Sequence, residues 1–121
     1  AAGIIYTVDV TKPKGEKITI ISMADGTPFS MDKMYKVALN SYRGNGGGEL
    51  LTKGAGIPQD ELKGRILFST DKDLRYYLMQ YIEKKGVIEP HALGQWKFIP
   101  EEWVEPAAKR DYEYLFGKVE K

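Results

Sequence analysis

Residues 4–23 decide how the fold begins, and they read IIYTVDVTKPKGEKITIISM. Residues 4–10 alternate between two faces and are rich in β-branched side chains, which is the pattern of a strand. Residues 12–15, Lys-Pro-Lys-Gly, provide turn chemistry, and residues 17–23 repeat the strand pattern. The stretch therefore predicts two strands joined by a loop, as in an antiparallel meander.

The sequence after this stretch predicts further strands and turns. Residues 25–28, Asp-Gly-Thr-Pro, predict a second turn, and residues 35–42 predict a third strand of the meander. A short helical turn is expected at residues 57–62 and a strand at residues 65–69. Residues 96–103 again alternate aromatic or apolar residues with polar ones.

Two amphipathic helices are predicted in the second half of the chain. Thr70 is the expected cap of the first helix and Gly86 its end, whereas Pro106 opens the second and Gly117 ends it. Their apolar side chains recur at helical spacing, so we expect them to be core. These side chains are Leu74, Tyr77, Leu78, Tyr81 and Ile82 in the first helix, and Ala108, Tyr112, Leu115 and Phe116 in the second. The charged residues after Gly117 are expected to be a fraying end.

Together these elements predict an α+β fold: a mixed, largely antiparallel sheet packed by two or three helices, in a single domain over residues 1–121. The length suits one domain, and 42% hydrophobic residues suffice for a core without a metal or disulfide. Eighteen basic residues against 17 acidic ones give a net charge of +1, which argues against a nucleic acid polymer as the partner. The absence of cysteine excludes thiol catalysis and Cys-ligated zinc.

Several functional classes have no support in the sequence. No apolar run approaches the ~20 residues of a membrane span, so none is expected. The one histidine, His91, lies beside Pro90 in a loop-like stretch, where it cannot form a histidine-rich metal centre. We therefore expect no catalytic residue and no metal ligand in this chain. It begins Ala-Ala-Gly without an initiator Met or a signal peptide, which suggests a piece of a longer protein.

The glycine-rich segment that follows Tyr42 is the candidate binding loop. Arg43 begins it, and four of the next five residues are glycine. The spacing fits neither the dinucleotide fingerprint nor the P-loop. An exposed tyrosine beside flexible, donor-rich backbone suits a flat heterocycle, because the ring offers a stacking face. A glycine-rich turn with a half-buried tyrosine is the alternative interpretation.

Residues 35–49, YKVALNSYRGNGGGE, resemble the segment Y-K-V-A-x-N-(Y/F)-x-x-x-G-G of the 5′-nucleotidase C-terminal domain family. This family also includes domains of UDP-sugar hydrolases and of 2′,3′-cyclic-nucleotide 2′-phosphodiesterases. Residues 25–28 and 73–90 are similar to the flanking family sequence, so the resemblance spans about residues 3–90. The stretch from Trp96 onward lies outside this resemblance, and no family role is assigned to its residues.

The resemblance implies a two-domain, periplasmic or secreted phosphohydrolase of nucleotide catabolism. An N-terminal metallophosphatase domain, outside this chain, would hold two divalent metals and the catalytic residues, and the C-terminal domain would grip the nucleoside. Tyr42 matches the second of two aromatics that sandwich the base, and the first lies upstream of Ala1. The 5′-nucleotidase branch has a ribose-binding aspartate at the position where this chain has Gly48. The form Tyr-Arg-Gly-Asn-Gly-Gly therefore resembles the cyclic phosphodiesterase branch more closely.

Two hypotheses follow. In the first, the chain binds the nucleoside of a nucleotide substrate. Its substrate-binding residues are Tyr42, Arg43, Asn45, Gly46, Gly47 and Glu49. In the second, the chain is a non-catalytic module that binds a carbohydrate or a protein through exposed aromatics, for which Trp96, Trp103 and Tyr114 are the candidates.

Overall fold

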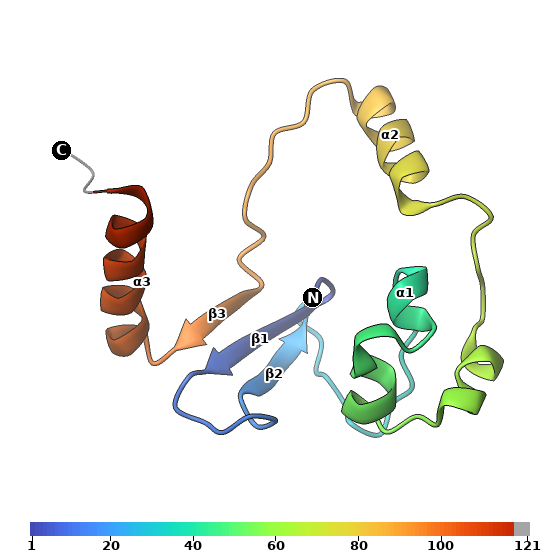
Figure 1. Cartoon of the computed structure of the whole chain (residues 1–121), viewed down its shortest axis with the longest axis horizontal. Coiled ribbons are helices and arrows are strands. Elements are labelled where there is room, and N and C mark those ends of the chain that lie inside the picture. The colour runs from blue at the N-terminus through green and yellow to red at the C-terminus, as the bar shows by residue number, and fades with distance from the viewer. Residues whose placement is uncertain (118–121) are drawn as a thin grey trace. The chain divides into compact units, whose positions relative to one another are not determined.

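The first two predicted strands pair as expected in the computed structural model, which describes residues 1–117 (Figure 1). β1 (Ile4–Asp9) pairs antiparallel with β2 (Ile18–Met23). The register sets Tyr6 opposite Ile20, with an irregularity between Ile5 and Tyr6. The predicted fraying end after Gly117 lies outside the described residues.

The third strand of the sheet comes from the C-terminal part of the chain. β3 (Trp96–Ile99) pairs parallel with β1, so that the strand order is β2-β1-β3 and Trp96 lies opposite Tyr6. The alternation of residues 96–103 thus marks a strand over its first half. The sheet is mixed, and together with the helices it gives a single small α+β domain, the predicted fold class.

The last helix begins earlier than the sequence predicted. α3 (Glu101–Phe116) starts five residues before Pro106, which lies inside it, and ends at Gly117 as predicted. Pro100 is the N-cap in an extended conformation, and Glu101 with Glu102 places negative charge at the positive helix end. These features favour a helix start at Glu101, although Pro106 has no N–H to donate within the helix.

Within the domain, the Cα positions group into two compact units. One comprises Ala1–Lys33 with the chain from His91 onward, and therefore contains the sheet and α3. The other is Met34–Pro90, which contains the candidate binding loop. Its elements are α1 (Ser41–Gly44), 3-10 turns at Gly47–Glu49, Gln59–Glu61 and Lys63–Arg65, a π-helical turn at Leu50–Gly54, and α2 (Leu74–Lys85).

Two predicted strands are wrong in the second unit. Residues 35–40 are irregular and residues 41–44 are helical, because the side chain of Asn40 caps the N-terminus of α1. Lys63–Arg65 is a 3-10 turn, and residues 66–69 are irregular. The helical turn expected at 57–62 is present as Gln59–Glu61, with Pro58 as its N-cap.

The first predicted amphipathic helix forms, but it starts later than expected. Asp73 rather than Thr70 is the N-cap of α2, because the Asp73 carboxylate accepts a hydrogen bond from the Tyr76 N–H at 2.9 Å. Thr70 instead donates its hydroxyl proton to the Lys72 carbonyl. Gly86 ends the helix with φ 75°, as predicted.

The apolar stripe of α2 is exposed rather than core. Its side chains keep between 41 and 64% of their surface accessible. Among the described residues the only hydrophobic side chain that is buried is Leu62, at 5% exposure, which belongs to the unit of the candidate loop. The packed part of this unit therefore lies around Leu62 and not along α2.

Candidate functional site

Tyr42 lies on a short helix whose start is fixed by Asn40. The Asn40 side chain accepts a hydrogen bond from the Arg43 N–H at 2.9 Å, and its carbonyl accepts one from Gly44 at 2.9 Å. These two bonds hold the turn that presents Tyr42, whose side chain is 63% exposed. A ring held at this degree of exposure can accept a planar ligand.

Gly47 lies directly against the ring of Tyr42. A Cβ at position 47 would come within 2.6 Å of ring atoms Cδ2 and Cε2 and within 2.5 Å of the Tyr42 carbonyl oxygen. Only glycine allows this approach of the backbone to the ring. Part of the ring is thus supported by the loop, and the rest is open to solvent.

The guanidinium of Arg43 lies over the same ring. Its central carbon is 5.5 Å from the centroid of Tyr42, a cation–π contact. Its Nη1 donates a long hydrogen bond, 3.4 Å, to the Gly47 carbonyl, and a Cβ at Gly48 would overlap the same nitrogen. Within residues 1–117 no carboxylate forms an ion pair with Arg43, so its charge is open to a ligand.

Asn45 and Gly46 are held by Gln59 and Leu62, which are not among the predicted site residues. Gln59 Nε2 donates to the Asn45 carbonyl at 3.1 Å. Gly46 has φ 93°, and a Cβ there would come within 2.5 Å of Gln59 Oε1 and 3.1 Å of the Leu62 side chain. The turn at residues 57–62 was predicted, but the sequence carried no signal that it packs on the loop.

Glu49 adopts a left-handed backbone conformation with φ 58°, and no other described non-glycine residue has a positive φ. Such a conformation costs an L-residue about 1–2 kcal/mol and tends to occur at functional sites. The carboxylate forms an ion pair with Lys53 at 2.6 Å. One carboxylate oxygen is therefore engaged and the side chain stays exposed at the end of the loop.

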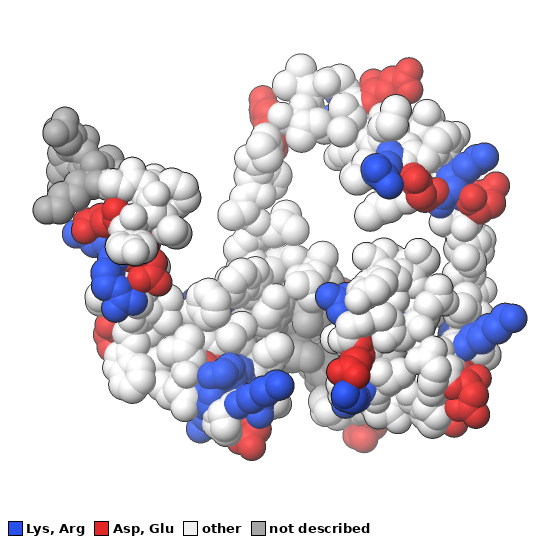
Figure 2. Space-filling model, viewed as in Figure 1, with Lys and Arg blue, Asp and Glu red and all other residues white. Residues whose placement is uncertain are grey.

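All six predicted substrate-binding residues thus lie in one short structure, residues 42–49. Most of the loop is exposed, so it could offer a ligand a ring face and hydrogen-bonding groups at the surface. Charges of both signs are interspersed on the visible face of the molecule (Figure 2), and no large basic surface is seen there.

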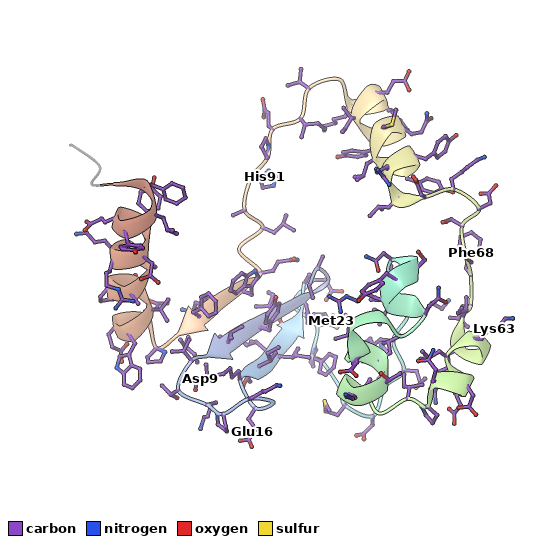
Figure 3. The ribbon with its side chains drawn as sticks, viewed as in Figure 1. Asp9, Glu16, Met23, Lys63, Phe68 and His91 are labelled. Atoms are coloured by element: carbon purple, nitrogen blue, oxygen red, sulfur yellow. The ribbon has the colours of Figure 1, made fainter. Side chains whose placement is uncertain are left out.

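The described residues offer no metal centre. No group of three or more His, Asp or Glu side chains in residues 1–117 is placed to hold a metal ion. His91 lies in the irregular segment between α2 and β3 (Figure 3), as its sequence context predicted. None of the helices in this part of the chain has the length and apolar composition needed to cross a membrane.

The aromatics of the alternative hypothesis lie in the other unit. Trp96 is 47% exposed, stacks beside Tyr6 with ring centroids 6.1 Å apart, and meets Phe98 edge-on. It lines a cavity of about 390 Å³ with Leu93 and Gln95. Trp103 and Tyr114, on α3, are exposed as well. Trp96 therefore offers an exposed aromatic face beside a cavity in the unit that contains the sheet.

Comparison with known families gave a match that covers the candidate loop. Residues 1–53 match the model of the family described as 5′-nucleotidase, C-terminal domain. The comparisons with curated proteins and with solved structures gave no match. The predicted similarity of residues 54–90 lies beyond the matched range. The matched range contains β1, β2, α1 and every predicted substrate-binding residue, and over this range the chain resembles the C-terminal domain of 5′-nucleotidases, as its sequence indicated.

Proposed function

We propose that this chain supplies the nucleoside-recognition part of a nucleotide phosphohydrolase. The observation that supports it is the Tyr42 ring, which is exposed, backed by Gly47 and flanked by the cation of Arg43, inside the range that matches the 5′-nucleotidase C-terminal domain. Stacking of a base on such a ring contributes about 1–3 kcal/mol.

Each loop residue has a role in this proposal. Tyr42 stacks the base, while the amides of Gly46 and Gly47 and the side chain of Asn45 hold the sugar side. Glu49 accepts a hydrogen bond from a ribose hydroxyl, in place of the aspartate that Gly48 replaces. The energy of these contacts holds the phosphoester in position for hydrolysis elsewhere, since orientation converts binding energy into rate.

The hydrolysis itself is assigned to a metallophosphatase domain outside this chain. Its two divalent metals would activate the attacking water and stabilise charge on the phosphoryl group. Because Tyr42–Arg43 precedes the glycines, we favour a cyclic-nucleotide phosphodiesterase over a 5′-monoesterase or a UDP-sugar hydrolase. The parent enzyme would act in the periplasm or outside the cell, in nucleotide catabolism.

An NMR titration of the chain with uridine and with a neutral disaccharide tests the proposal. We expect uridine to shift amide signals of residues 42–49, and the disaccharide to leave them unchanged. Tyr42→Ala should abolish the shifts, and Tyr81→Ala, at a tyrosine of similar exposure on α2, should not. Uridine shifts that survive Tyr42→Ala would refute the stacking role.

The exposure of Trp96 beside a cavity supports a second candidate, a carbohydrate- or protein-binding module. In the same titration this candidate predicts disaccharide shifts at residues 93–98 that Trp96→Ala removes. It predicts no response of residues 42–49 to uridine.

A further inference from the structure

The two faces of the Tyr42 ring have different surroundings. Over one face lies the guanidinium of Arg43, whose central carbon is 5.5 Å from the ring centroid. The ring edge formed by Cδ2 and Cε2 lies against the backbone of Gly47. Tyr42 nevertheless keeps 63% of its surface accessible, so the accessible surface lies mainly on the opposite face and the remaining edge. The loop therefore leaves a ligand one face of the ring.

The structure shows what holds the guanidinium over the ring. Its Nη1 donates a long hydrogen bond, 3.4 Å, to the carbonyl of Gly47, the same residue that lies against the ring edge. Glycine at position 48 leaves the space for it, because a Cβ there would overlap Nη1. No carboxylate in the described part of the chain pairs with Arg43. The attraction between the cation and the ring therefore acts without a competing ion pair.

A base has a cheaper route to one face of the ring than to the other. Stacking on the Arg43 face requires displacement of the guanidinium, which gives up its contact with the ring and its hydrogen bond to Gly47. Stacking on the opposite face keeps both interactions. The free energy of binding should therefore be more favourable on the face opposite Arg43.

We infer that a nucleobase stacks on the face of Tyr42 opposite Arg43, and that Arg43 is a positioning residue that holds the ring from behind. The inference rests on the proposed function and specifies how its site is built. It replaces the direct contact with substrate that the sequence predicted for Arg43. A ring that is already held by Arg43 and Gly47 loses less rotational freedom when a base stacks on it, and such preorganisation raises affinity.

NMR of the wild-type chain with inosine shows which face the base takes. The ring current of Tyr42 should shift the side-chain protons of Arg43 next to the guanidinium upfield, and we expect this shift to remain at saturating inosine. Nuclear Overhauser effects from inosine H2 and H8 should reach the ring protons of Tyr42 and not the side chain of Arg43. Loss of the upfield shift on binding, its absence in the free chain, or Overhauser effects to Arg43 would each overturn the inference.

Variants test the positioning role. Arg43→Met should weaken inosine binding about two- to fivefold, the factor that an exposed cation–π contact supplies. Arg43→Lys keeps a cation that can lie over the ring and should keep most of the affinity. Gly48→Ala fills the space of the guanidinium, so it should remove the upfield shift at Arg43 and weaken binding as Arg43→Met does. Arg75→Met, at an exposed arginine on α2 in the same unit, is the matched control.

The outcomes separate this inference from the proposed function. An Arg43→Met chain that binds inosine as tightly as the wild-type chain, or more tightly, would overturn the inference and leave nucleoside binding intact. An Arg43→Lys chain that binds no better than Arg43→Met would do the same. If inosine shifts no amide signal of residues 42–49 in the wild-type chain, both are overturned. The amide spectrum of each variant without ligand establishes that it is folded.

Discussion

The ring of Tyr42 rests on the backbone of Gly47, so closely that a Cβ at position 47 would lie 2.6 Å from two ring carbons. Gly47→Ala should therefore displace the ring, weaken nucleoside binding and lower the free energy of unfolding by about 1–3 kcal/mol, the usual cost of overpacking. Urea unfolding measures the stability. Gly64→Ala is the control, since a Cβ there meets nothing within 4 Å, and equal effects of the two variants would contradict the contact.

Replacement of Glu49 should separate stability from function. Glu49→Gly removes the strain of φ 58° at an L-residue, and it also removes the exposed ion pair with Lys53. Because the first effect is the larger, we expect a net rise of about 0.5–1 kcal/mol in the free energy of unfolding. Nucleoside affinity should fall, because the carboxylate is lost. Lys53→Met removes the pair and leaves the backbone unchanged. A Glu49→Gly chain less stable than Lys53→Met would contradict this account of the strain.

Gln59 should control the mobility of the loop. Gln59→Ala removes the hydrogen bond to the Asn45 carbonyl, worth about 1 kcal/mol, so amide exchange at Gly46 and Glu49 should accelerate about fivefold. Hydrogen exchange followed by NMR measures this. Gln80→Ala, at an exposed position of α2, serves as the control. Unchanged exchange in Gln59→Ala would show that the loop keeps its form without this bond.

The sequence predicted the local structure correctly where a single local signal is present and no second signal competes with it. The alternation in β1 and β2 and the glycines that end α2 and α3 are such signals. Residues 35–42 were misassigned because the apolar alternation competes with a helix cap at Asn40, and the cap is favoured. The late start of α2 has the same origin, since Asp73 caps it in preference to Thr70.

The candidate site was predictable in part. Tyr42 and the glycines are contiguous in sequence, so their proximity needed no knowledge of the fold. Gln59 contacts Asn45 from 14 residues away, and Leu62 packs on Gly46. Contacts of this kind depend on tertiary packing, for which a single sequence carries no periodic signal.

Two aspartates should make stability depend on pH. The hydroxyl and the N–H of Thr27 donate to the Asp25 carboxylate, which holds its pKa below the usual 3.8, and Thr11 lowers the pKa of Asp9 in the same way at the end of β1 (Figure 3). A lowered pKa in the folded state stabilises the fold above pH 3.8, and this stabilisation is lost as the pH falls through the folded-state value.

Urea unfolding between about pH 6 and pH 2.5 measures this dependence. We expect stability to fall with pH below 3.8, and Asp25→Asn to lose part of that dependence because it cannot titrate. Asp71→Asn is the control variant. An identical pH dependence in Asp25→Asn and the wild-type chain would exclude a contribution from the Asp25 turn.

The central claim is that Tyr42 binds a nucleobase by stacking, and the affinity of the chain for inosine tests it most directly. We predict that Tyr42→Ala weakens binding about 5- to 150-fold, the range expected from the loss of one stacked base, and that Tyr42→Phe retains most of the affinity because it keeps the ring. Tyr81→Ala, on α2, should bind as the wild-type chain does. Equal affinities of the wild-type, Tyr42→Ala and Tyr81→Ala chains, or no binding by the wild-type chain, would contradict the account.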